Sequence, residues 1–184
     1  MFPFVIPELP SISMAQFVSE VGERTLKARV PAFGTIELTY GCNLRCVHCY
    51  NPTHQARNEV STEKILSIMD ELEKAGTRFL DFTGGEIFTR KDWRQVLEYA
   101  KKKSFFLHLI TNATLITPDI ADLLERLELV WVKVSLYGAT KETYEKVTRV
   151  PGSFELFLRG VELLRSRRIP VMMQSILLTL NAHE

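Results

Sequence analysis

The chain has 184 residues, of which 46% are hydrophobic, and its formal net charge is +1 at pH 7. This length and composition are typical of one globular domain with a sizeable core, and the balanced charge excludes a bulk attraction to nucleic acid or an anionic membrane. No apolar run reaches transmembrane length and no signal peptide is recognisable, so we expect a cytoplasmic protein with reduced thiols.

Residues 1–33 form a short N-terminal extension to the rest of the chain. Its prolines keep the first ten residues irregular, and Ser13 is suited to cap a helix that extends to about Ala28. We therefore assign residues 1–33 to an extension with one helix and residues 34–184 to the main domain.

After Gly34, short apolar runs alternate with segments of helical periodicity. Strands are predicted over residues 35–40, 77–83, 105–111, 130–136 and 171–180. Helices are predicted from Ser61 to Gly76, over 91–103, from Pro118 to about Leu127, after Thr140, and from a cap at Ser153 to about Arg168. Parallel neighbours need helical crossovers, so the alternation predicts an α/β fold with a parallel sheet.

All three cysteines, Cys42, Cys46 and Cys49, lie within eight residues directly after the first predicted strand. In a reducing compartment this spacing is more typical of metal ligands than of a disulfide. Three thiolates leave one coordination position open. A zinc site would take its fourth ligand from His48 or His54, whereas a four-iron cluster would keep one iron free for a substrate or cofactor.

Polar residues or glycines follow every predicted strand. In parallel α/β sheets the active site forms at the carboxyl ends of the strands. Besides the cysteines, the residues at these ends are Gly84, Gly85, Glu86, Asn112, Ser135, Tyr137, Asn181 and Glu184. The sequence therefore predicts one site built from several strand ends.

The pattern C-x3-C-x2-C followed by an aromatic residue resembles the signature of the radical S-adenosylmethionine (SAM) enzymes. The resemblance implies that Cys42, Cys46 and Cys49 hold a [4Fe–4S] cluster whose free iron chelates the amino and carboxyl groups of SAM. It also implies a parallel-sheet partial TIM barrel of six βα units. Five such units are present, so we expect the chain to be a fragment of a longer enzyme.

Two further segments carry the resemblance. Thr83 to Glu86 resembles the GGE motif of the family, which implies that Gly84, Gly85 and Glu86 bind the methionine ammonium of SAM. Ser135 falls where the family has its ribose-contacting segment. The alternatives are an ordinary strand-to-helix turn at the glycines and a serine hydroxyl satisfied by its own turn.

Four other side chains have less specific assignments. Asn112 is a SAM-contacting residue by position, although Asn after a strand is also common turn chemistry. The ring of His48 is expected to pack against adenine. His54 and His108 are interpreted as structural, and Arg149 as a solvated helix arginine.

The segments around residues 137–144 and 151–154 resemble the subgroup with a C-terminal SPASM or twitch domain, whose members modify ribosomal peptides, proteins or tetrapyrroles. The predicted function is reductive cleavage of SAM to a 5′-deoxyadenosyl radical that abstracts hydrogen from a peptide, a protein or a cofactor precursor. The electron donor would be a flavodoxin or ferredoxin. No residue is assigned a role in acid–base catalysis. The alternatives are a non-catalytic zinc or iron–sulfur module and an inactive truncated remnant.

The end of the chain predicts an unprotected edge. Residues 171–180 are expected to form one apolar strand with almost no charge, proline or bulge. We therefore expect the isolated chain to self-associate through Ile176, Leu177 and Leu178.

Overall fold

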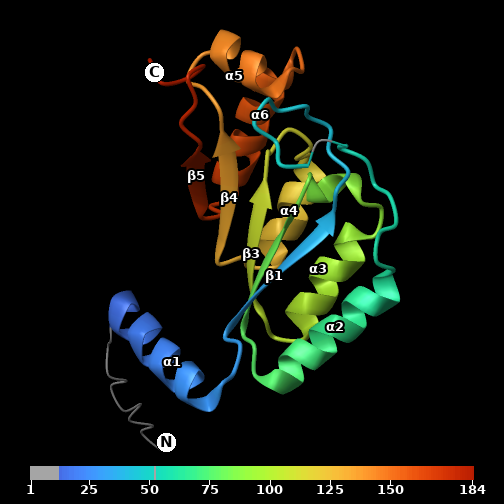
Figure 1. The fold of residues 1–184 in the computed structure, drawn as a ribbon, viewed down its shortest axis with the longest axis vertical. Coiled ribbons are helices and arrows are strands. Elements are labelled where there is room, and N and C mark those ends of the chain that lie inside the picture. Colours follow the sequence, from blue (N-terminus) through green and yellow to red (C-terminus); the bar gives the residue numbers. More distant parts are fainter. Residues whose placement is uncertain (1–12, 52) are drawn as a thin grey trace, which may run out of the picture.

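The computed structural model describes residues 13–51 and 53–184. One parallel sheet has the strand order β1-β2-β3-β4-β5 (Figure 1), with β1 at Phe33–Thr39, β2 at Phe79–Gly84, β3 at Phe106–Thr111, β4 at Trp131–Leu136 and β5 at Val171–Ser175. The helices are α1 (Met14–Ala28), α2 (Thr62–Ala75), α3 (Trp93–Lys102), α4 (Pro118–Arg126), α5 (Lys141–Thr148) and α6 (Ser153–Ser166), with one 3-10 turn, η1 (Ile87–Thr89). The predicted α/β fold with five parallel strands is confirmed.

Local capping chemistry explains where the helices begin. The Ser61 hydroxyl accepts a hydrogen bond from the backbone of Lys64 at the start of α2, and the Thr140 hydroxyl accepts one from Thr143 at the start of α5. Pro118 occupies the first turn of α4, where its missing donor is not needed. These starts agree with the sequence predictions because each depends on a few neighbouring residues.

The core lies between one face of the sheet and the helices packed on it. Alternate strand residues point to this face and are completely or almost completely buried, among them Leu80, Phe82, Leu109, Val132 and Val134. The residues between them point to the opposite, concave face. Phe33 and Phe106 on that face are 56% and 52% exposed, so helices cover only one side of the sheet in the described part of the chain.

Helix α1 lies beside the lower end of the sheet and projects away from the main body (Figure 1). It begins at the predicted cap, where Ser13 and Gln16 form a reciprocal capping box, and it ends at Arg29 in the left-handed conformation. The helix predicted within the extension is thus confirmed. The irregular segment predicted for the first ten residues lies outside the described residues.

Two predicted boundaries are wrong. The cap of α6 is Gly152 and not Ser153, whose hydroxyl instead lies 2.8 Å from that of Thr148. Strand β5 ends at Ser175, so Ile176 to Leu180 do not extend the sheet. The Asn181 side chain accepts a hydrogen bond from Leu178 and donates to the carbonyls of Ile176 and Tyr137, which draws this segment into a turn.

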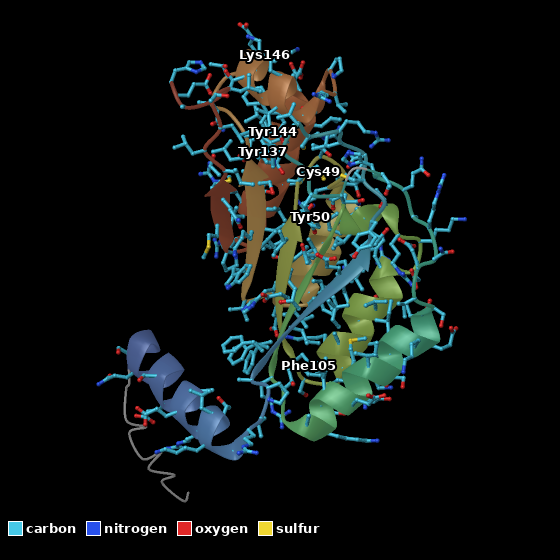
Figure 2. The ribbon with its side chains drawn as sticks, in the orientation of Figure 1. Cys49, Tyr50, Phe105, Tyr137, Tyr144 and Lys146 are labelled. Carbon is cyan, nitrogen blue, oxygen red and sulfur yellow. The ribbon has the colours of Figure 1, made fainter. Side chains whose placement is uncertain are left out.

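The two ends of the sheet differ in chemistry. Cys49, Tyr50, Tyr137 and Tyr144 gather at the carboxyl ends of the strands, and Phe105 lies at the opposite end (Figure 2). The thiol and most of the labelled tyrosines therefore lie at one end of the strands.

No helix in the described ranges 13–51 and 53–184 has the length and hydropathy needed to cross a membrane.

Candidate functional site

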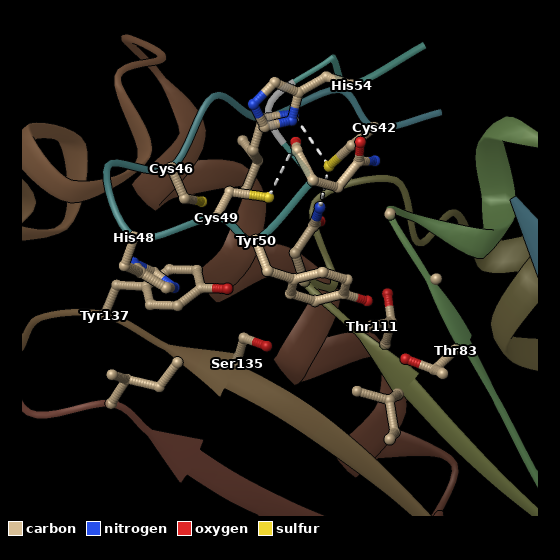
Figure 3. Close-up of a pocket in the computed structure, with 17 residues that line it drawn as sticks. Cys42, Cys46, His48, Cys49, Tyr50, His54, Thr83, Thr111, Ser135 and Tyr137 are labelled. Carbon is tan, nitrogen blue, oxygen red and sulfur yellow. Dashed lines mark hydrogen bonds between the residues drawn. The ribbon is translucent and has the colours of Figure 1, made fainter. Parts of the chain in front are cut away.

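The loop after β1 brings the three cysteines to a cavity of about 220 Å³ at the carboxyl ends of the strands (Figure 3). The cavity is lined by Cys42, Leu44, Cys46, His48, Cys49, Tyr50, Asn51, His54, Thr83, Gly84, Gly85, Ile110, Thr111, Asn112, Ser135, Tyr137 and Ile176. Residues from β1 through the segment after β5 thus meet in one place, as the strand-end pattern predicts.

Backbone hydrogen bonds hold the cysteine loop in place. The amide of Arg45 donates to the carbonyl of Thr148 at 3.0 Å, and the amide of Val47 donates to the carbonyl of Val147 at 2.9 Å. These carbonyls belong to the last turn of α5 and would otherwise lack intrahelical partners. The loop is therefore anchored on a helix that follows it by many residues in the sequence.

Gly84 and Gly85 allow the end of β2 to press against the start of the cysteine loop. A Cβ atom at Gly84 would lie 2.3 Å from the Thr39 carbonyl oxygen, and one at Gly85 would lie 2.3 Å from the Gly41 carbonyl oxygen. The Gly85 amide donates to Thr39 at 2.7 Å. The close approach seen here is thus between two segments of backbone, while both glycines also line the cavity.

Glu86 is fully buried and lies behind the cavity lining. Its carboxylate accepts hydrogen bonds from the Thr111 hydroxyl at 2.9 Å and the Asn112 amide at 2.8 Å. Burial raises the pKa of Glu86 to about 7, against the lowering effect of these donors. The geometry shows a residue that joins β2 to β3, and the predicted contacts of Gly84, Gly85 and Glu86 with the SAM ammonium stay predictions.

Asn112 ties the end of β3 to the cysteine loop. Its side-chain nitrogen donates to the side-chain Oδ1 of Asn43 at 3.1 Å and lies 3.9 Å from the Cys42 sulfur. Its side-chain oxygen accepts from the Thr114 backbone at 2.9 Å, and Asn43 donates to the Thr114 hydroxyl at 2.7 Å. Asn112 lines the cavity, so its predicted contact with SAM is compatible with this network.

Ser135, Tyr137 and His48 form the side of the cavity next to β4 (Figure 3). The His48 and Tyr137 ring centroids lie 4.9 Å apart with a tilt of 56°. Burial lowers the pKa of His48, and its Nδ1 atom is buried without a partner in the described chain. Ser135 and His48, the two predicted SAM contacts on this side, and the strand-end residue Tyr137 all line the cavity.

The other two histidines differ from each other. His54 lines the cavity with a positive φ of 49°, and its Nδ1 atom is buried without a partner in the described chain. It is therefore part of the site region, although it is interpreted above as structural unless the site holds zinc. His108 lies within β3, where its Nδ1 is 2.6 Å from Asp81 and its ring stacks on Trp131. Arg149 is exposed, as expected.

The cysteine thiols lie in a partly buried environment. Burial raises the pKa of Cys46 to about 12 and raises the pKa of Cys42 above its ordinary value. Metal ions bind thiolates, so loading the site with metal releases protons from these thiols.

The donor set fits a cluster better than a single ion. Within the described residues, no group of three His, Cys, Asp or Glu side chains is close enough together to hold one metal ion. Tetrahedral zinc needs its ligands at about 2.0–2.3 Å from one point. An iron–sulfur cluster distributes its cysteines over different irons, which suits three thiols placed around a shared cavity. Cys42, Cys46 and Cys49 would hold such a cluster.

Sequence reasoning missed several residues of the site. Thr83 and Thr111 lie at strand ends and line the cavity. Their positions at the strand ends are the only sequence feature that could have identified them. Tyr50 also lines the cavity, and its hydroxyl donates to Glu37 at 2.8 Å. Asn43 contributes by hydrogen bonds across the fold, which no local pattern reveals.

The fold, the cysteine loop and the strand-end residues together define a parallel α/β domain with three thiols at one strand-end cavity. The sequence profile of the Radical SAM superfamily matches residues 36–184, and the chain belongs to this family. The members are enzymes, and their cofactors are a [4Fe–4S] cluster and SAM.

Curated relatives are longer than this chain. The AdoMet-dependent heme synthase of Methanosarcina barkeri is 34% identical over 150 residues, which cover 80% of this chain and 43% of that protein. The mycofactocin maturase MftC of Mycobacterium tuberculosis is 35% identical over 158 residues, which cover 85% of this chain and 40% of the maturase. The chain thus spans about two fifths of the length of these relatives.

A solved structure shares the fold. SuiB of Streptococcus suis bound to its precursor peptide SuiA has a TM-score of 0.71 at 15% identity, over 91% of this chain and 41% of SuiB. The predicted partial barrel of the radical SAM type is confirmed by this likeness and by the family match. The similarity to the maturase MftC also agrees with the predicted SPASM-type subgroup.

Proposed function

We propose that this chain is the core of a radical SAM enzyme that binds a [4Fe–4S] cluster through Cys42, Cys46 and Cys49 and cleaves SAM reductively. When bound, the cluster supplies the electron that breaks a carbon–sulfur bond of SAM, giving methionine and a 5′-deoxyadenosyl radical that abstracts a substrate hydrogen. The observation that carries the proposal is the meeting of three thiols with four strand ends around one cavity.

The chain's own residues bind and orient the cofactors. Gly84 and Gly85 present backbone groups to the methionine end of SAM, because no side chain stands between their backbone and the cavity. Ser135 offers a hydroxyl for the sugar and Asn112 an amide. Glu86 positions this wall through Thr111 and Asn112.

The substrate and the electron donor belong to the same proposal. A peptide or protein substrate is supported by the similarity to MftC and SuiB, and a cofactor precursor by the similarity to the heme synthase. A flavodoxin or ferredoxin would deliver the electron. We retain residues 1–33 as an extension and residues 34–184 as the catalytic core, acting in the cytoplasm.

The test is anaerobic reconstitution of the chain with iron and sulfide. We expect about four irons per chain, a broad visible absorbance and 5′-deoxyadenosine on addition of SAM and a reductant. Cys46→Ala should lose all three signals. Its apoprotein should unfold at the same denaturant concentration as the wild-type apoprotein, which excludes general misfolding as the cause.

The same measurement separates the enzyme from a structural metal module. One zinc per chain with no bound iron would contradict the proposal and favour the module. Iron retained by a variant that lacks all three cysteines would place the cluster elsewhere. A cluster with no SAM cleavage at all would favour an inactive remnant.

A further inference from the structure

A row of side chains crosses the concave face of the sheet at the lower rim of the cavity. In the strand register Glu37 pairs with Thr83, Ile110 pairs with Lys133, and Lys133 pairs with Met172. Thr83 and Ile110 line the cavity. Lys133 therefore continues, on β4, a row whose neighbouring member is part of the cavity wall.

The position of Lys133 along β4 gives the same placement independently. Side chains two residues apart in a strand share a face, and they are separated by about 6.5 Å. Ser135 lines the cavity, so Lys133 lies on the same face one step below it. Lys133 is therefore adjacent to the cavity wall without lining the cavity itself.

The ammonium of Lys133 rests on an aromatic surface. Its Nζ atom lies 4.8 Å from the ring centroid of Trp131, and Trp131 stacks on His108 with centroids 4.0 Å apart. His108 in turn is held by Asp81 through a contact of 2.6 Å. Cation–π contact of this kind orients a lysine without neutralising its charge.

Lys133 is an unusual charge for its location. It is the only Lys or Arg within the five described strands, and it is only partly exposed. Among the described residues no carboxylate lies within 4 Å of its ammonium, whereas ion pairs do occupy lysines such as Lys103 and Lys141. Its ammonium is therefore free to form a charge-assisted hydrogen bond with an anion from outside the chain.

We propose that Lys133 binds a carboxylate of the substrate on the concave face below the SAM cavity, an inference that rests on the proposed function. The partly exposed ring of Trp131, which His108 supports from behind, would contact the apolar part of the molecule beside that carboxylate. Asp81 and Glu37 lie on the same face. Their negative charges disfavour a dianion such as phosphate more strongly than a singly charged carboxylate.

The experiment compares phenylacetate with phenylacetamide, which have nearly the same shape but differ in charge. Binding to the reconstituted, SAM-loaded chain is followed by the fluorescence of Trp131, in a Trp93→Phe background because the chain has only 2 tryptophans. We expect phenylacetate to bind about tenfold more tightly, as one charge-assisted hydrogen bond allows. Lys133→Met should abolish this preference, and Lys102→Met, an exposed lysine on α3, should retain it.

Two results would overturn the inference. One is equal binding of the two probes, or no saturable response to phenylacetate. The other is a Lys133→Met variant that keeps the preference for phenylacetate.

A third measurement distinguishes the source of the carboxylate. If Lys133→Met weakens SAM binding while the preference for phenylacetate survives, the anion is that of SAM and the inference is wrong. A wild-type chain that prefers phenylacetate but produces no 5′-deoxyadenosine would instead contradict the proposed function and leave the inference about Lys133 standing. The two failures are therefore separable.

Discussion

The cysteine loop follows β1 at one edge of the sheet, and β5 forms the opposite edge. The two regions are stabilised by different kinds of contact. Around the loop, Asn43 and Asn112 bond to each other and to Thr114, and the backbone bonds to α5. On the other side β5 pairs only with β4 among the described strands, and Met172 and Met173 are 48% and 44% exposed.

The difference indicates where rigidity is needed. A cofactor that must be held in one orientation requires side chains with few alternative positions, which a closed hydrogen-bond network supplies. The β5 side holds no comparable network in the described chain, apart from the turn at Asn181. Substitutions on the loop side should therefore cost stability and cofactor binding together, while those at β5 should affect association.

The largest effect is expected at the contact between β2 and the cysteine loop. Gly85→Ala places a Cβ atom 2.3 Å from the Gly41 carbonyl oxygen, so the loop must shift. We expect a loss of about 3 kcal/mol in the free energy of unfolding, together with loss of cluster assembly. Chemical denaturation of the apoprotein and iron analysis after reconstitution measure the two effects.

The matched control for this substitution is Gly22→Ala. Nothing lies within 4 Å of a Cβ atom at Gly22, which is within α1. Alanine in a helix is favoured over glycine by about 0.5–1 kcal/mol, so this variant should be no less stable than the wild type. A Gly85→Ala chain as stable as Gly22→Ala would show that the loop is not pressed against β2.

The next effect concerns pH and Glu86. Its pKa is raised from 4.5 to about 7 by burial, so between these values the folded state holds a proton that the unfolded state has released. The corresponding stability is fully present below about pH 4.5 and is lost as pH rises through 7. The loss is about 3 kcal/mol, and Glu86→Gln should remove this slope.

Denaturation of the apoprotein at a series of pH values measures the slope. Glu162→Gln, an exposed residue on α6, is the control and should keep the wild-type profile. A wild-type profile that is flat or rises between pH 5 and 7, once the Glu162→Gln profile is subtracted, would mean that the hydrogen bonds from Thr111 and Asn112 outweigh burial.

A smaller effect is expected from the asparagine network. Asn43→Ala removes the bonds to Thr114 and Asn112, and we expect a loss of about 1–2 kcal/mol in the apoprotein. A double-mutant cycle with Thr114→Val should give a coupling energy of about 1 kcal/mol. Additive losses from the two substitutions would mean that the bond between them contributes no stability.

The smallest effect on stability is expected at β5. Met173→Lys puts a charge on a strand edge, which opposes pairing with another copy, and should change the free energy of unfolding by less than about 0.5 kcal/mol. Light scattering should show less self-association. Leu177→Lys, beyond the end of β5, is the comparison. If only Leu177→Lys lowered association, the contact would lie in the turn and not along β5.

Local signals in the sequence predicted most of the fold. Ser61, Pro118 and Thr140 mark helix starts because capping depends on residues within one turn. The end of β5 was mispredicted because Asn181, which lies beyond the apolar run, captures the backbone of that run. A hydrophobic pattern cannot reveal a competing hydrogen bond from outside it.

For the site, the sequence identified the residues that present chemistry and not those that hold them in place. The three cysteines and Gly84, Gly85, Ser135 and Asn112 all line the cavity, while their contacts with cofactors stay predictions. Glu86 was interpreted from its motif as a ligand, but its partners Thr111 and Asn112 come from the next strand. The position of a buried carboxylate is set by tertiary contacts, which the motif does not contain.

The anchoring of the cysteine loop on α5 has a consequence for the order in which the protein is made. The amides of Arg45 and Val47 find their acceptors at Thr148 and Val147. The ribosome synthesises the three cysteines about 100 residues before Val147 and Thr148. The nascent loop therefore lacks these two hydrogen bonds until β4 and α5 have been synthesised. We therefore expect the three cysteines to reach their native arrangement only after most of the sheet has been synthesised.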